Sequence, residues 1–158
     1  RNFTLDGLNL EVSNCRYAVH DEQSGADVQY YNVYKNCIMK NTTTENSGIT
    51  GNQYPQCIGG GLGKHGYIEI YGGKYTSTGV PDASGEIPCI SYHNGAISGA
   101  DSKIFIKDLY LDGDEGNLRF GYYGPSTVKS QILVCDCSMG SAIIHRGETP
   151  SLDRKRVV

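Results

Sequence analysis

The sequence predicts an all-β chain folded as a parallel β-solenoid, and three observations support this. A short segment recurs five times, a second series of apolar stretches falls between its copies, and the apolar residues alternate with the period of a strand. The chain has 158 residues, about the size of one domain. Its 21 Gly and 5 Pro favour short strands separated by turns.

The recurring segment begins with an apolar or aromatic residue and carries Gly, Asn or Asp at its third position, where such residues accept a bend. Its sixth position is Leu, Met or Tyr. The copies align without gaps and begin 28 to 36 residues apart. They are Leu5–Leu10, Tyr34–Met39, Ile70–Tyr75, Ile106–Leu111 and Val134–Met139.

A second apolar stretch follows each copy, so one repeat holds at least two strands. The stretches are Tyr17–His20, Cys57–Gly60, Cys89–Tyr92, Leu118–Gly121 and Ala142–His145. Just before two of the repeated segments, Tyr67–Ile70 and Lys103–Ile106 alternate with period two and carry β-branched and aromatic residues, which indicates strands rather than helices.

Equivalent residues of stacked repeats should lie above one another at about 4.8 Å. The first positions, Leu5, Tyr34, Ile70, Ile106 and Val134, are therefore expected to form one column. The fourth positions form a second, interior column of Leu8, Cys37, Gly73, Leu109 and Cys137. A β-sandwich is the alternative fold, but it predicts hairpins and no internal repeat. We expect one domain over residues 1–158, cut from a longer solenoid, because neither end resembles a cap.

Composition excludes several classes of function. The formal net charge of −3 argues against nucleic acid as a partner. No apolar run approaches the length of a membrane-spanning helix, so no membrane partner is expected. The six Cys residues lack zinc-ligand spacing and are interpreted as buried apolar residues rather than disulfides. We expect no metal and no cofactor.

Carboxylates supply the candidate catalytic residues, because glycoside hydrolysis uses two of them. Asp108 and Asp136 share one repeat position in adjacent repeats, but a bend that bonds local backbone is the preferred interpretation. The remaining candidates are an acidic turn and a His beside two carboxylates, where a proton could be shuttled. These residues are Asp112, Asp114, Glu115, Asp21, Glu22 and His20.

Aromatic residues supply the candidate binding surface. The chain has 12 Tyr and no Trp, and a Tyr ring can stack on a sugar while its hydroxyl bonds the sugar's edge. The candidate substrate-binding residues lie in or after the second series of strands. They are Tyr92, His93, Tyr122 and Tyr123.

The repeated pattern, with the second strands Ala18-Val19-His20 and Ala142-Ile143-Ile144-His145, resembles right-handed parallel β-helix proteins of the pectate-lyase-like superfamily. It is most similar to β-helix portions of phage tail-associated proteins and tailspikes, over about residues 3 to 147. The resemblance implies about five coils, a carbohydrate-facing role, a virion-surface or extracellular location and a possible homotrimer. The polygalacturonase-type motifs Asn-Thr-Asp, Asp-Asp, Gly-His-Gly and Arg-Ile-Lys are absent.

The leading hypothesis is a polysaccharide-recognising β-helix module of a phage tail or cell-surface protein. A glycoside hydrolase or polysaccharide lyase using the surface carboxylates is the second hypothesis, and a structural tail-fibre spacer is the third. The sequence leaves the glycan and the question of catalysis open.

Overall fold

The computed structural model is all-β within the residues it describes, which are 2–13, 15–23, 29–43, 55–78, 89–94, 101–113, 118–122, 131–139 and 142–146. Across these ranges no helix is long and apolar enough to cross a membrane. The strands are β1 (Phe3–Asp6), β2 (Asn9–Val12), β3 (Tyr17–His20), β4 (Gln29–Asn41), β5 (Gln56–Leu62), β6 (His65–Ser77), β7 (Ile90–Asn94), β8 (Lys103–Lys107), β9 (Tyr110–Gly113), β10 (Leu118–Tyr122), β11 (Gln131–Cys135) and β12 (Ala142–Arg146).

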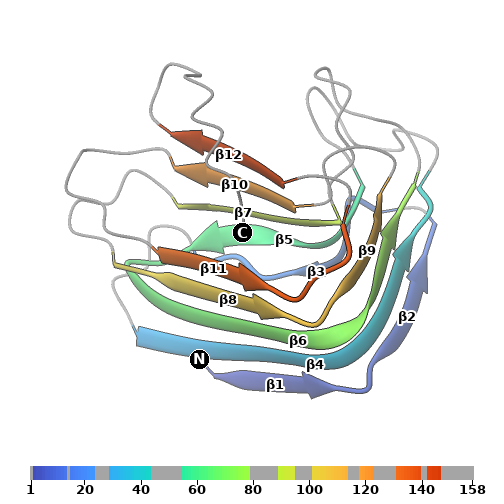
Figure 1. The fold of residues 1–158 in the computed structure, drawn as a ribbon, viewed down its shortest axis with the longest axis horizontal. Coiled ribbons are helices and arrows are strands. Elements are labelled where there is room, and N and C mark those ends of the chain that lie inside the picture. Colours follow the sequence, from blue (N-terminus) through green and yellow to red (C-terminus); the bar gives the residue numbers. More distant parts are fainter. Residues whose placement is uncertain are drawn as a thin grey trace.

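These strands form two parallel sheets (Figure 1). The larger sheet runs β1-β4-β6-β8-β11, with β2 paired to β4 and β9 paired to β6. Its long strands β4 and β6 turn sharply, which divides it into two limbs. The first limb contains β1, β8, β11 and the first halves of β4 and β6, and the second contains β2, β9 and the second halves. The smaller sheet runs β12-β10-β7-β5-β3.

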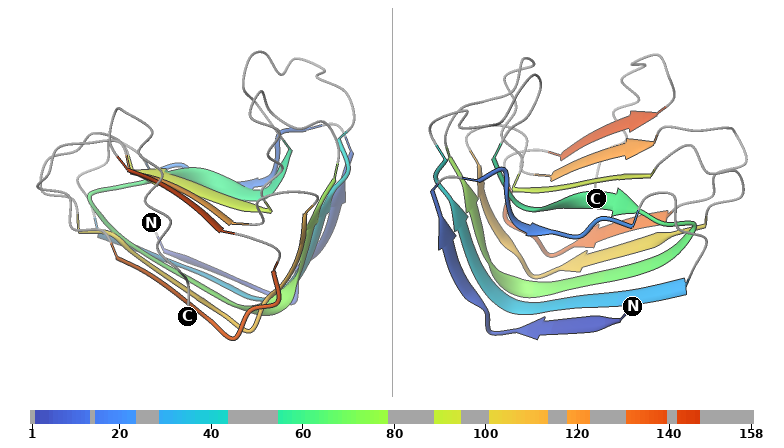
Figure 2. Two further views of the ribbon diagram at one scale, coloured as in Figure 1. Left: turned by 45° about the horizontal axis from the view of Figure 1, so that its top comes forward. Right: turned by 180° about the vertical axis from the view of Figure 1, so that it is seen from behind.

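The chain visits both sheets in turn and does so five times. Each pass adds one long strand, or two short ones (β1 and β2, β8 and β9), to the larger sheet beside its predecessor and then one strand to the smaller sheet. The predicted first column is confirmed, because the pairs Leu5↔Tyr34, Tyr34↔Ile70, Ile70↔Ile106 and Ile106↔Val134 are all in register. Figure 2 shows the two limbs and the smaller sheet as three sides around one interior.

The corner between the limbs lies at the third position of the repeated segment. All five residues there have positive φ: Gly7 (68°), Asn36 (50°), Gly72 (60°), Asp108 (58°) and Asp136 (53°). Glycine tolerates this left-handed region, and Asn and Asp visit it more readily than other residues with a side chain. The predicted bend is therefore confirmed, and the two aspartates occupy corner positions in successive passes.

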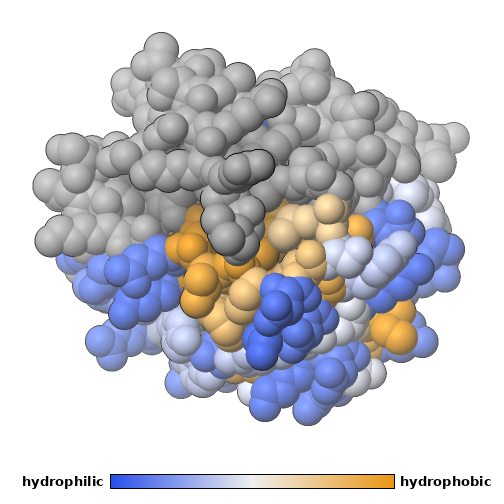
Figure 3. All heavy atoms as spheres, in the orientation of Figure 1, coloured by the Kyte–Doolittle hydropathy of each residue, from blue (hydrophilic) through white to orange (hydrophobic). Residues whose placement is uncertain are grey.

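The interior is filled by the inward-facing residues of both sheets. Ile68, Ile70, Ile104 and Ile106 are at most 2% exposed. All six cysteines are free, as expected. Cys37, Cys57 and Cys89 are buried, which confirms the interpretation as small core residues for these three, whereas Cys15, Cys135 and Cys137 are only partly buried. The partly buried members of the core come mainly from the first and last passes: Phe3, Leu5, Leu8, Val19, Ile132, Cys137 and Met139. Figure 3 shows apolar atoms reaching the surface near the middle of one face.

Candidate functional site

Two of the predicted site residues lie inside the molecule. Asp21 directly follows β3 and is 3% exposed, and Tyr92 of β7 is 1% exposed. The Tyr92 hydroxyl donates to Asp21 Oδ2 at 3.1 Å, and the Tyr34 hydroxyl donates to the same oxygen at 3.0 Å. Asn32 Nδ2 donates to Asp21 Oδ1 at 2.8 Å. The carboxylate therefore accepts hydrogen bonds from three side chains of β4 and β7.

This burial corrects the expectation that Asp21 and Tyr92 belong to a surface site. Burial, together with the nearby Asp21 charge, raises the pKa of the Tyr34 and Tyr92 hydroxyls well above the ordinary range. Both hydroxyls therefore stay protonated as donors, which is the state that satisfies a buried carboxylate. These side chains are enclosed in the interior, where a glycan at the surface does not reach them. Their hydrogen bonds hold passes one, two and three together.

The other predicted site residues do not form one cluster, and several lie outside the part of the chain that the structure describes. His20 and Glu22 are exposed, and His20 Nε2 lies 3.5 Å from Glu22 Oε2. The His20 ring also stacks on Tyr17 at a centroid distance of 4.3 Å. Asp112 is exposed on β9. Asp114, Glu115 and Tyr123, as well as the side chains of His93 and Tyr122, lie outside the described part of the chain.

The first limb carries a different group of side chains on its outer face. Residues of β4, β6 and β8 alternate there, so every second side chain lies on the outer face while those between are buried; Val33, which shares the outer face, is covered by its neighbours and only 4% exposed. Glu69 of β6 is at the centre, paired in register with Val33 and Phe105 on its two sides. The Glu69 patch is defined as Glu69 and its eight outward-facing neighbours: Tyr31, Val33, Lys35, Tyr67, Tyr71, Lys103, Phe105 and Lys107.

Tyrosine hydroxyls converge on the central carboxylate. The Tyr31 hydroxyl donates to Glu69 Oε2 at 2.5 Å, and the hydroxyls of Tyr67 and Tyr71 act on the same carboxylate by lowering its pKa. Burial acts to raise the pKa of Glu69, but these hydroxyl bonds and the charge of Lys35 outweigh it and hold the pKa below its ordinary value. The same hydrogen bond raises the pKa of Tyr31 to about 12. At neutral pH the patch therefore holds an ionised Glu69 and protonated tyrosines.

The rings of the patch form two pairs. Tyr31 and Tyr67 lie nearly parallel, with centroids 5.2 Å apart and planes 13° apart. Tyr71 and Phe105 meet edge to face at 5.5 Å. Tyr31 and Tyr67 are 41% and 37% exposed, which is high for large aromatic residues. The hydroxyl bonds to Glu69 restrict these rings, so they form an ordered apolar platform with a carboxylate at its centre.

Such a platform suits binding better than metal chemistry. Ring faces can stack on flat apolar ligand surfaces, while the carboxylate and hydroxyls can exchange hydrogen bonds with hydroxyl groups. In the described part of the chain, no group of three or more His, Cys, Asp or Glu is arranged to hold a metal ion.

The sequence contains a signal for this site that our selection of residues did not use. Tyr67, Glu69 and Tyr71 alternate with buried isoleucines along one strand, so they were bound to share a face. None of these three residues is among the site residues predicted above.

No family model, curated protein or solved structure matches this chain.

Proposed function

We propose that this protein is a carbohydrate-binding parallel β-solenoid, the module of a phage tail or cell-surface protein, and that glycans bind at the Glu69 patch. The observation that carries the proposal is the cluster of three exposed or half-buried tyrosines around one ionised carboxylate on a flat sheet face. The solenoid itself is supported by the five in-register passes and by the shared corner position.

Sugar rings present both kinds of surface that this patch offers. Their apolar C–H faces stack on aromatic rings, and their hydroxyls form hydrogen bonds with carboxylates and phenols. Because Tyr31 donates to Glu69 and stacks on Tyr67, this part of the platform is held in place before any ligand arrives. Preorganisation of this kind reduces the entropy lost on binding.

The position of the patch also fits an extended ligand. Its nine residues come from three successive passes, and strands of neighbouring passes are about 4.8 Å apart. A polysaccharide lying across the strands can therefore contact Tyr31, Tyr67 and the β8 side chains in turn. A repetitive surface matched to a repetitive polymer allows several weak contacts to act together.

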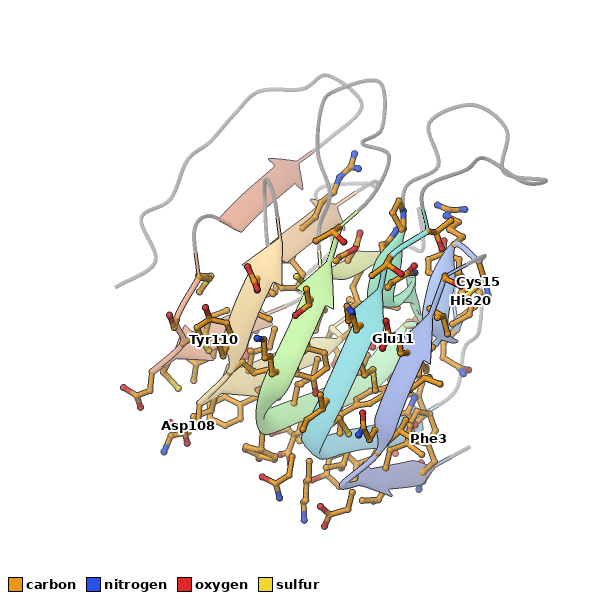
Figure 4. All side chains as sticks on the ribbon, turned by 90° about the vertical axis from the view of Figure 1, so that its right-hand side faces the viewer. Phe3, Glu11, Cys15, His20, Asp108 and Tyr110 are labelled. Carbon is orange, nitrogen blue, oxygen red and sulfur yellow. The ribbon has the colours of Figure 1, made fainter. Side chains whose placement is uncertain are left out.

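Binding to an array of bacterial and plant polysaccharides tests the proposal, with Tyr67→Ala as the site variant. Tyr110→Ala is the matched control, because Tyr110 is also an exposed tyrosine (48%) on the same sheet. It lies on the outer face of the second limb, as Figure 4 shows. We expect Tyr67→Ala to weaken binding about five- to tenfold, which corresponds to an aromatic contact of about 1–1.4 kcal/mol. Tyr110→Ala should leave it unchanged.

Two outcomes would contradict the proposal. One is an array on which the folded protein binds no polysaccharide. The other is binding that Tyr67→Ala and Tyr110→Ala weaken equally, which would place the glycan elsewhere. Assaying any bound polysaccharide for new reducing ends or unsaturated products separates binding from the hydrolase or lyase alternative.

A further inference from the structure

We infer that the Glu69 patch selects acidic glycans, meaning polysaccharides that carry carboxylate or sulfate groups; this rests on the proposed function. Glu69 has four diagonal neighbours on the outer face, and three of them are lysines. Lys35 lies on β4, and Lys103 and Lys107 lie on β8. The fourth is Tyr31.

The charge of the patch is opposite to that of the chain. Within the nine residues of the patch, three lysines against one glutamate give a formal charge of +2, with Asp6 beside Lys35 and Asp108 beside Lys107 at its border, whereas the whole protein carries −3. A local positive potential on an acidic protein attracts anionic ligands and discourages binding of other proteins' basic regions. The lysines are therefore a selective feature of this face rather than a consequence of composition.

The carboxylate at the centre does not neutralise all three lysines. Glu69 is half-buried, and its Oε2 already accepts a hydrogen bond from the Tyr31 hydroxyl. Lys103 is exposed at the edge of the patch. Lys107 Nζ is 3.8 Å from Asp108 Oδ2, but both side chains are largely exposed, and ion pairs between exposed side chains are weak.

Two rings of the patch, Tyr67 and Tyr71, have lysines beside them on the neighbouring strands. Tyr71 is paired in register with Lys35 on one side and Lys107 on the other, and Tyr67 is paired with Lys103. Neighbouring strands are about 4.8 Å apart, within the reach of a lysine side chain. A sugar stacked on Tyr71 or Tyr67 therefore brings a carboxylate or sulfate on its rim next to an ammonium group, where a charge-assisted hydrogen bond can form.

The test compares matched acidic and neutral polymers: hyaluronan against its carboxyl-reduced form, and dextran sulfate against dextran. We expect at least one acidic polymer to bind at least about tenfold more tightly than its neutral partner, a difference of about 1.4 kcal/mol that one charge-assisted hydrogen bond can supply. That advantage should shrink as salt is raised. The two pairs distinguish carboxylate from sulfate as the recognised group.

The site variant is Lys35→Gln combined with Lys107→Gln, which should remove the preference for the acidic polymer. The control is Lys40→Gln, because Lys40 is exposed on the second limb and pairs with Glu11 at 2.8 Å. Equal loss in the control would show attraction to charge in general and overturn the inference.

The remaining outcomes separate the two proposals. If neutral and acidic polymers bind equally and Tyr67→Ala still weakens both, the inference fails and the proposed function stands. If no polymer here or on the array binds the folded protein, both fail.

Discussion

Replacing Asp21 with alanine tests whether the buried hydrogen-bond network holds the first three passes together. The substitution leaves three buried donors without their acceptor: Asn32 Nδ2 at 2.8 Å, and the hydroxyls of Tyr34 and Tyr92 at 3.0 and 3.1 Å. An unsatisfied buried donor costs about 1–3 kcal/mol. The losses are not additive, and removing a buried charge offsets part of them. We therefore expect the free energy of unfolding to fall by about 3–5 kcal/mol.

Urea unfolding followed by tyrosine fluorescence and far-UV circular dichroism measures this change, since the chain has 12 Tyr and no Trp. Asp21→Asn should lower the free energy of unfolding by less, about 1–2 kcal/mol, because one carbonyl oxygen remains as an acceptor. Tyr34→Phe and Tyr92→Phe should be coupled in a double-mutant cycle, because both hydroxyls bond the same carboxylate oxygen.

The neighbouring carboxylate provides the control. Glu22 is exposed and pairs only loosely with His20, at 3.5 Å, so Glu22→Ala should change stability by no more than about 0.5 kcal/mol. The reasoning is refuted if Asp21→Ala is as stable as the wild type, or if Glu22→Ala costs as much as Asp21→Ala.

Three further predictions concern the backbone, the patch and the core. Gly60→Ala should destabilise the fold by more than about 2 kcal/mol, because its Cβ would lie 1.9 Å from a carbonyl oxygen of the preceding pass. A Cβ at position 7 would meet open space, but the backbone φ there is +68°, so Gly7→Ala should lower the free energy of unfolding by only about 1 kcal/mol. Equal urea midpoints for Gly60→Ala and Gly7→Ala would contradict this contrast. Tyr31 should titrate near pH 12 by NMR, and Glu69→Gln should lower that midpoint. Because the folded-state pKa is raised, this hydrogen bond stabilises the protein fully below about pH 10 and is lost as pH rises through about 12; an unchanged midpoint in the variant would refute it. Burial raises the pKa of the Cys57 thiol, so iodoacetamide should label Cys57 only after unfolding, as peptide mass mapping would show; labelling in the native state would contradict its burial.

The sequence alone determined the strands, their register and the corner between the limbs. These features are local and repeated: alternation assigns side chains to faces, and Gly, Asn or Asp marks the left-handed position in every repeat. Because stacked passes must bury the same face, one repeated pattern was enough to align Leu5, Tyr34 and Ile70 in a column.

Only the tertiary structure decided which polar residues are buried and which surface residues meet. Asp21 reads as a surface residue, since unpaired aspartates are seldom buried, yet its donors lie 11, 13 and 71 residues away in the chain. The residues around Glu69 come from three different passes. Alternation along a strand determines the face on which a side chain lies, whereas its lateral neighbours depend on how the chain stacks.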